Sequence, residues 1–174
     1  KYLMDHGARV ILCSHLGRPK GGFDMKYSLK PVADRLSQML GREVPLAKDV
    51  VGPDAQKLAN ELNDGDVMLL ENVRFHPEEE NNDPEFSKQL AALAEVYVND
   101  AFGTAHREHA STAVIAQYFA STKFFGLLMA EELEAIDKVL KSGEKPVTAI
   151  LGGSKVSTKI TIIENILPAI DHLI

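Results

Sequence analysis

The organisation of this chain follows from one stretch, VILCSHLGRPKGG at residues 10–22. Its first four residues are apolar and predict a buried strand. A hydroxyl, an imidazole and two cations come next, and the Gly and Pro residues among them predict a loop. Open α/β sheets bind ligands at the carboxyl ends of their strands. Arg18 and Lys20 therefore indicate an anion site, although a solvated basic turn has the same composition.

The rest of the chain alternates between strand and helix patterns. Short apolar runs predict strands at residues 43–46, 67–70, 96–98 and 147–151. Apolar residues at helical spacing, with capping residues or Pro at the start and Gly or Pro at the end, predict helices at residues 28–40, 53–62, 83–94, 131–141 and 152–166. This alternation predicts an α/β fold of three layers, in which helices cover both faces of a Rossmann-like parallel sheet.

Composition and charge exclude several classes of protein. The 174 residues are 45% hydrophobic and 25% charged, which is a globular balance. The net charge of −6 argues against a general nucleic-acid binder, because such proteins need a basic face. The single cysteine, Cys13, cannot form an internal disulfide, which favours a reducing cytoplasm and a packing role. The apolar stretch 112–130 is interrupted by polar residues and Gly126, so we expect no membrane span.

A turn that bears Gly, Lys and Pro at residues 142–146 is the predicted domain boundary. It divides the chain into an N-terminal domain, residues 1–141, and the start of a second domain, residues 146–174. The chain begins on the tail of a helix that Gly7 stops, without an initiating Met, and it ends as another strand starts. Both ends are therefore expected to be truncated.

Three successive buried strands of this prediction, at residues 10–13, 67–70 and 96–98, run out into loops that carry Arg and His. Arg74 lies in the stretch 70–76, and Arg107 lies in the stretch 99–109. In a parallel sheet these strand ends lie on the same edge. An arginine after a strand is usually solvated or ion-paired when it is taken singly. Together with Arg18, the three predict a multi-arginine pocket for a small polyanion, whose oxygens guanidinium groups grip in pairs.

Other features of the sequence allow competing interpretations. His106 and His109 have the spacing i, i+3, but no matching cluster elsewhere supports a metal site, and we name no metal ligand. The acidic run 78–80 is more typical of a solvated loop than of catalytic carboxylates. The turn at residues 152–155 lacks the spacing of a Walker A loop, although it can present backbone N–H groups and a lysine to a phosphate.

Four stretches together resemble phosphoglycerate kinase: SHLGRP at 14–19, LENVRFH at 70–76, NDAFGTAHR at 99–107 and LGGSKVSTKI at 151–160. The resemblance implies a two-domain glycolytic enzyme that transfers a phosphoryl group between 1,3-bisphosphoglycerate and ADP, giving 3-phosphoglycerate and ATP. It also implies site residues. His15, Arg18, Arg74 and Arg107 would bind the phosphoglycerate, Lys155 would be catalytic, and Gly153, Lys155 and Lys159 would contact the nucleotide.

The same resemblance implies further properties. The nucleotide would carry Mg²⁺, with the metal's protein ligands outside these residues, and the helix at 131–141 would connect the two domains. The family's opening strand and most of its nucleotide domain are missing here, so residues 1–174 alone are expected to be inactive. The parent enzyme is expected to be a cytoplasmic monomer that binds neither nucleic acid nor membrane.

Two rival functions remain open from the residues themselves. One is a sugar-phosphate isomerase, which needs a carboxylate or His base beside the pocket. The other is a binding module that senses an anion without catalysis. Phosphoryl transfer needs charge neutralisation and alignment more than a nucleophilic side chain, so His15 is better interpreted as a hydrogen-bond donor than as a general base. Only the kinase hypothesis requires ATP to form from ADP and an acyl phosphate.

Overall fold

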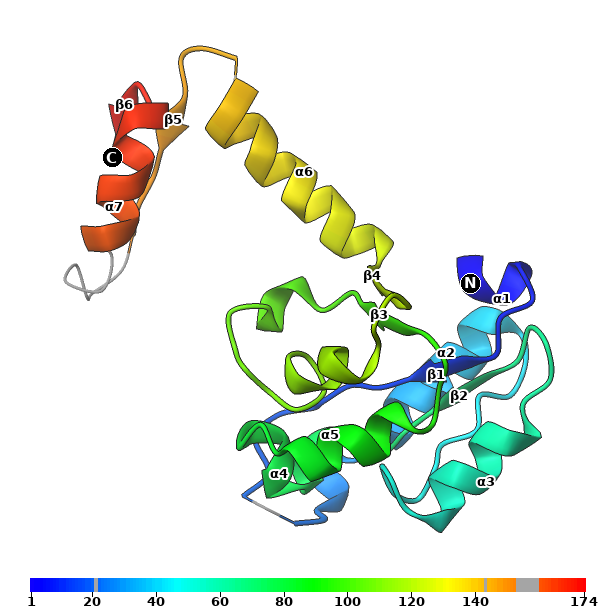
Figure 1. The fold of residues 1–174 in the computed structure, drawn as a ribbon. Coiled ribbons are helices and arrows are strands. Elements are labelled where there is room, and N and C mark those ends of the chain that lie inside the picture. The colour runs from blue at the N-terminus through cyan, green and yellow to red at the C-terminus, as the bar shows by residue number, and fades with distance from the viewer. Residues whose placement is uncertain (21, 143, 153–159) are drawn as a thin grey trace. The chain divides into compact units, whose positions relative to one another are not determined.

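The computed structural model describes residues 1–20, 22–142, 144–152 and 160–174. Contacts divide the chain into two compact units, Lys1–Phe124 and Phe125–Ile174. Each unit combines helices with short strands (Figure 1). The two are described separately below.

The first unit alternates between strands and helices. Its strands are β1 (Val10–Leu12), β2 (Val67–Leu69), β3 (Tyr97–Asn99) and β4 (Lys123–Phe125), of which the last ends just beyond the unit. Its α-helices are α1 (Tyr2–Asp5), α2 (Lys30–Leu40), α3 (Pro53–Glu61), α4 (Pro77–Glu80) and α5 (Pro84–Ala91). Its 3₁₀ helices are η1 (Met25–Tyr27), η2 (Val73–Phe75), η3 (Phe102–Thr104) and η4 (Val114–Tyr118).

Strand β2 is the centre of this unit, because it is bonded along both edges. It pairs in parallel with β1, with Val10 opposite Val67. On its other edge, Leu69 donates its N–H to the Pro45 carbonyl at 2.8 Å and accepts from Ala47 at 2.9 Å. The predicted strand 43–46 is wrong as a strand, since it is reduced to one parallel bridge between Leu46 and Leu69. Proline has no N–H with which to continue a ladder.

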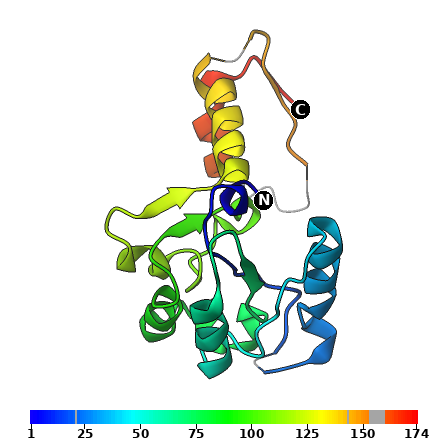
Figure 2. The ribbon, with the colours of Figure 1, turned by 90° about the vertical axis from the view of Figure 1, so that its right-hand side faces the viewer.

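Alternate residues of β2 enter two separate cores. Met68 contributes to a cluster with Phe86 and Leu90 of α5, whereas Leu69 contributes to a cluster with Ala33 of α2. Successive side chains of a strand point to opposite faces, so the two clusters lie on opposite faces of the β1–β2 pair. Figure 2 shows α2 on one side of these strands and α3 and α5 on the other. This layering of helix, parallel strands and helix is the arrangement that the alternating sequence predicts.

Local signals start and end the helices largely where the sequence predicts. The Asp83 carboxylate accepts the Phe86 N–H at 2.8 Å at the start of α5. The Ser28 hydroxyl accepts the Lys30 N–H at 3.2 Å, although α2 itself begins at Lys30. Gly41 adopts the left-handed conformation that ends α2.

Two expectations about the strands differ from the structure. Strand β3 pairs with β4 instead of joining β1 and β2 in one hydrogen-bonded sheet of the described residues. Cys13 is exposed, although the apolar run before it predicts packing. Among the described strands, β1 is paired along its β2 edge alone.

The second unit contains α6 (Leu127–Ser142), β5 (Thr148–Ala149), α7 (Ile160–Ile166), the 3₁₀ helix η6 (Leu167–Ala169) and β6 (His172–Leu173). Strands β5 and β6 pair in parallel, as expected for a strand, helix, strand unit. Contacts group α6 with this unit, whereas the sequence places the domain boundary after the helix. The domains 1–141 and 146–174 stay a prediction. No helix in the described part of the chain has the length and apolar character needed to span a membrane.

The loop after β1 folds back on η1 through a close approach at Gly17. This residue has φ +63°, and a Cβ atom placed on it would lie 2.5 Å from two ring carbons of Tyr27. Gly41 has nearly the same φ, +65°, but no atom lies within 4 Å of its Cβ position. Only glycine fits both the backbone conformation and the contact at residue 17.

Replacing these two glycines separates backbone strain from the contact with Tyr27. Gly41→Ala should cost about 1 kcal/mol of folding free energy, the strain of a left-handed alanine. Gly17→Ala should cost about 2 kcal/mol or more, because the Tyr27 ring must also move. Thermal unfolding of both variants tests this difference. Equal losses would show that the contact at Gly17 contributes nothing.

Candidate functional site

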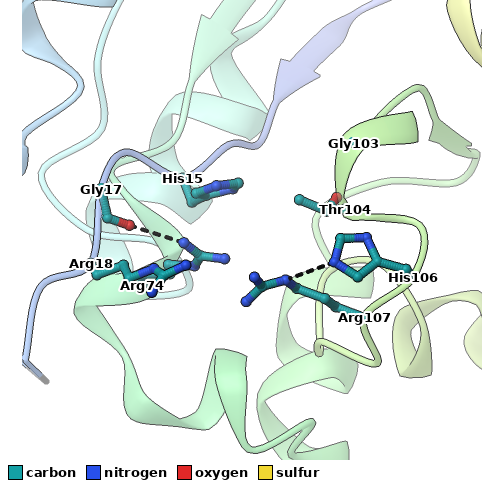
Figure 3. Close-up of a pocket in the computed structure, with 8 residues that line it drawn as sticks. All are labelled: His15, Gly17, Arg18, Arg74, Gly103, Thr104, His106 and Arg107. Carbon is teal, nitrogen blue, oxygen red and sulfur yellow. Dashed lines mark hydrogen bonds between the residues drawn. The ribbon is translucent and has the colours of Figure 1, made fainter. Parts of the chain in front are cut away.

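The loops that follow β1, β2 and β3 meet around one pocket of about 290 Å³ in the first unit (Figure 3). Three elements contribute to it: the loop after β1, η2 after β2, and η3 with the turn after β3. The lining residues are His15, Gly17, Arg18, Arg74, Gly103, Thr104, His106 and Arg107. The convergence of three strand-end loops is what the sequence predicts.

Arg74 is the most enclosed cation of the pocket, with 6% of its surface exposed. Its Nη1 donates to the Gly17 carbonyl at 2.9 Å, and its Nε lies 3.5 Å from the Glu80 carboxylate. Its backbone N–H donates to the Asn72 side chain at 3.0 Å, which forms the start of η2. These bonds hold the guanidinium between the loops after β1 and β2.

The other two arginines are more accessible than Arg74. Arg18 is exposed, and Arg107 is half-buried. The Arg107 Nε donates to His106 Nε2 at 3.3 Å, and its backbone N–H donates to the Thr104 carbonyl at 2.9 Å. Figure 3 shows the Arg107 guanidinium extending across the pocket toward Arg18 and Arg74. The planar groups of three arginines therefore face one space.

In the view of Figure 3, His15 lies above Arg18 and Arg74, near the start of the loop after β1. Burial lowers the pKa of its imidazole below the usual value, and the Arg74 guanidinium lowers that pKa further. His109 and Arg107 act in the same direction, while Glu80 opposes them. Because the cationic form is disfavoured, the ring is neutral at pH 7 and can serve as a hydrogen-bond donor through one nitrogen.

Buried polar side chains attach the loop after β1 to the end of β2. The Glu71 carboxylate accepts from the Ser28 hydroxyl at 2.7 Å and from the Leu29 N–H at 2.8 Å. The Asn72 amide donates to the Leu16 carbonyl at 2.8 Å and to the Tyr27 carbonyl at 2.9 Å. These contacts fix the segment that carries His15 and Arg18.

The acidic run 78–80 is not the solvated loop that the sequence indicates. It lies in α4, and Glu79 is 2% exposed. Its carboxylate accepts from the N–H of Ser111 at 2.9 Å and from its hydroxyl at 2.6 Å. A single helical turn is too short to show apolar periodicity, so the sequence gives no sign of this burial.

The pocket collects positive charge without a lining carboxylate. Three guanidinium groups and two imidazoles line it, whereas Glu80 approaches Arg74 from outside the lining set. Guanidinium groups bind carboxylate and phosphate oxygens with two parallel hydrogen bonds. The arrangement is therefore suited to a small anion with several oxygens.

The structure brings together four of the predicted site residues, namely His15, Arg18, Arg74 and Arg107. Their role in binding stays a prediction. Gly153, Lys155 and Lys159 lie outside the described residues. Sequence reasoning did not assign Gly103, Thr104 or His106 to the pocket, although all three stand in the stretch 99–107 that carries Arg107.

The two histidines of the HREH sequence have different surroundings. His106 lines the pocket, while His109 is buried with its Nδ1 3.8 Å from Glu79 Oε1. Within the described residues, no group of three or more His, Cys, Asp or Glu side chains is placed to hold a metal ion. The two histidines therefore belong to different environments: His106 to the pocket and His109 to the contact with Glu79.

Comparison with known proteins identifies the family. The sequence profile of phosphoglycerate kinase matches residues 1–174. Cytosolic phosphoglycerate kinase 3 of Arabidopsis thaliana is 58% identical over 174 residues, which are 100% of this chain and 43% of the relative. Phosphoglycerate kinase of Moorella thermoacetica is 55% identical over 174 residues, again 100% of this chain and 44% of the relative. The chain thus spans less than half the length of these relatives.

Solved structures agree with the sequence relatives. Phosphoglycerate kinase of Coxiella burnetii superposes with a TM-score of 0.85 and 43% identity over 98% of this chain and 42% of that one. The enzyme of Pyrococcus horikoshii gives a TM-score of 0.84 and 33% identity over 99% of this chain and 44% of that one. These neighbours confirm the Rossmann-like α/β fold class. The conserved fold, the converging arginine loops and the match over all 174 residues lead to one conclusion: the chain belongs to the phosphoglycerate kinase family.

Proposed function

We propose that these residues belong to an enzyme that transfers a phosphoryl group between 1,3-bisphosphoglycerate and ADP, and that the cationic pocket binds the phosphoglycerate. One observation carries the proposal. Arginines from three separate strand-end loops line a single pocket of about 290 Å³. A ligand with a phosphate at one end and a carboxylate at the other has enough oxygens to engage several guanidinium groups at once.

The lining residues divide the binding task. Arg74, which the Gly17 carbonyl and Glu80 hold in place, supplies a fixed and buried cation. Arg18 is exposed and Arg107 is half-buried, so both guanidinium groups are accessible to an anion that enters the pocket. Neutral His15 adds an uncharged donor, which limits the repulsion among the cations before the ligand binds.

The chemistry proposed for the full-length enzyme balances without a nucleophilic side chain. In the direction that consumes ATP, a carboxylate oxygen of 3-phosphoglycerate forms a bond to the γ-phosphorus. The bond between that phosphorus and the bridging oxygen breaks, and ADP leaves. Charge neutralisation and alignment are the main contributions that a protein makes to this reaction.

Residues 151–160 are proposed to serve the nucleotide side of the reaction. Lys155 would contact the phosphoryl group in transfer, and Gly153 and Lys159 would contact the nucleotide phosphates. This assignment rests on the sequence motif alone. Mg²⁺ would accompany the nucleotide and neutralise its phosphates. The cationic pocket does not fit Mg²⁺, which prefers oxygen ligands, because its lining holds three guanidinium groups and no carboxylate.

The rival functions have less support from the pocket. A sugar-phosphate isomerase needs a base, and the nearby carboxylates are already engaged: Glu80 faces Arg74, and Glu79 accepts two bonds from Ser111. Neutral His15 is the remaining candidate base. An anion sensor would use the same arginines, but it would require no nucleotide motif at residues 151–160.

We also propose a cytoplasmic location and a monomeric parent enzyme. Plant relatives from Arabidopsis thaliana and Nicotiana tabacum are named cytosolic, and the single cysteine fits a reducing compartment. The net charge of −6 argues against nucleic acid as a partner. The expected partners are therefore small molecules, namely the phosphoglycerates and ADP or ATP.

An activity assay on the full-length enzyme tests the proposed function. ATP should form when ADP, Mg²⁺ and 1,3-bisphosphoglycerate are mixed with the protein, and residues 1–174 alone should form none. An isomerase would instead convert a sugar phosphate without nucleotide, and an anion sensor would bind without turnover. Absence of ATP formation by the pure, folded full-length protein would contradict the proposal.

Calorimetric titration with 3-phosphoglycerate tests the pocket residue by residue. Arg18→Ala and Arg107→Ala in the full-length enzyme should each lose about 1.5 to 3 kcal/mol of binding free energy, the range for hydrogen bonds to charged groups. Arg74→Ala should lose at least as much, because it also removes the bond to Gly17. Binding should weaken as salt is raised.

Lys48→Ala is the matched control, since Lys48 is an exposed cation outside the lining set. It should change the binding free energy by no more than about 0.5 kcal/mol, as is usual for surface substitutions. Unchanged binding in all three arginine variants would remove the pocket from the proposal.

A further inference from the structure

The loop that carries Arg107 is attached to α4 through one carboxylate. Glu79 accepts from Ser111 twice, with Oε2 taking the backbone N–H at 2.9 Å and Oε1 taking the hydroxyl at 2.6 Å. The Glu79 backbone carbonyl accepts the N–H of Ala110 at 2.9 Å. His109 adds a nitrogen 3.8 Å from Oε1. His109, Ala110 and Ser111 are thereby all held by the side chain or the backbone of Glu79.

Ser111 is held from its other side as well. Its carbonyl accepts the Tyr97 hydroxyl at 2.9 Å, so β3 and α4 both bind the same residue. The hydroxyl of Thr112, the next residue, donates to the Arg107 carbonyl at 3.4 Å. The bonds form a short path from Glu79 to the backbone of Arg107.

Glu79 also belongs to the segment that positions Arg74. Residue 74 lies in η2, and α4 starts three residues later with the acidic run. Glu80, the next residue, pairs with the Arg74 Nε at 3.5 Å. Adjacent carboxylates therefore act on the two sides of the pocket: Glu80 on Arg74, and Glu79 on the loop of Arg107.

We propose that Glu79 is a positioning residue, which holds the Arg107 loop opposite Arg74 through its bidentate contact with Ser111. The inference rests on the proposed function, because it assumes that both arginines bind the phosphoglycerate. Glu79 does not line the pocket, so the proposal gives it no contact with the ligand. It acts on binding by fixing the distance between two guanidinium groups that must grip one anion.

A carboxylate suits this task better than an uncharged side chain. Both of its oxygens accept, and Ser111 presents two donors to them. A glutamine of the same shape carries no charge: its oxygen accepts the Ser111 N–H and its NH₂ group donates to the Ser111 hydroxyl oxygen, through neutral bonds about half as strong as those to a carboxylate. Glu79→Gln should therefore loosen the loop while it leaves the packed volume almost unchanged.

The test is a double-mutant cycle on the full-length enzyme, read as the affinity for 3-phosphoglycerate. Arg107→Ala should weaken binding about 10- to 100-fold when Glu79 is present. Glu79→Gln should weaken it about tenfold by itself. In the Glu79→Gln background, the cost of Arg107→Ala should fall by about the same tenfold, to between about one- and tenfold, because a displaced arginine has less binding to lose.

Glu78→Gln is the matched control. It removes a neighbouring carboxylate of the same helix, which lies 3.9 Å from His76 Nδ1 and has no bond to residues 110 or 111. Its affinity for 3-phosphoglycerate should stay within about twofold of the unsubstituted enzyme. If Glu79→Gln does not fold, Ser111→Ala replaces it, since that variant removes only the hydroxyl donor and should show the same coupling with Arg107→Ala.

The outcomes separate the inference from the function on which it rests. Additive effects, with Arg107→Ala costing the same factor in both backgrounds, would overturn the positioning role even if Glu79→Gln lowered the unfolding temperature. Coupled effects with little change in unfolding temperature would support it. Failure of the unsubstituted full-length enzyme to bind 3-phosphoglycerate would overturn the proposed function, and the positioning role with it.

Discussion

Polar groups buried at the end of β2 must find hydrogen-bond partners, and the pocket depends on how they do so. Glu71, Asn72 and Arg74 are each less than a tenth exposed. Besides bonds among themselves and to Glu80, each has partners on the loop after β1, at Leu16, Gly17, Ser28 and neighbouring residues. A buried carboxylate or guanidinium without partners would destabilise the fold by several kcal/mol, so the fold and the loop position are coupled.

The same principle extends to the third loop. Glu79 is as deeply buried as Glu71, and its donors lie on the segment after β3. Glu71 thus connects the end of β2 with the loop after β1, and Glu79 connects α4 with the loop after β3. Buried carboxylates therefore hold in place the loops whose arginines are proposed to bind the ligand, and neither carboxylate lines the pocket.

Concentrating cations in one pocket is unfavourable until a ligand arrives. Like charges a few ångströms apart repel strongly where water is partly excluded. Glu80 offsets part of this repulsion at Arg74, and the lowered pKa of His15 removes one further charge. An anion that enters the pocket relieves the remainder, which contributes to its affinity. This accounts for a site that is rich in arginine within a chain whose net charge is −6.

Much of this could be predicted from the sequence, because the relevant signals are local. The apolar run at β2, the Asp83 cap and Gly41 each specify their own neighbourhood. The convergence of Arg18 and Arg74 follows from the parallel pairing of β1 and β2, whereas Arg107 follows β3, which pairs with β4 instead. The role of Glu79 could not be predicted, because its partner is 32 residues away and its helix is one turn long. The loss of the strand at 43–46 depends on Pro45, whose effect appears only when the neighbouring strand is known.

The most direct test of the account is a crystal structure of the full-length enzyme with 3-phosphoglycerate bound. The account predicts ligand oxygens within about 2.7 to 3.2 Å of guanidinium nitrogens of Arg18, Arg74 and Arg107, so that one anion contacts all three strand-end loops. A ligand bound elsewhere, or one that contacts a single loop while the other arginines face solvent, would contradict it.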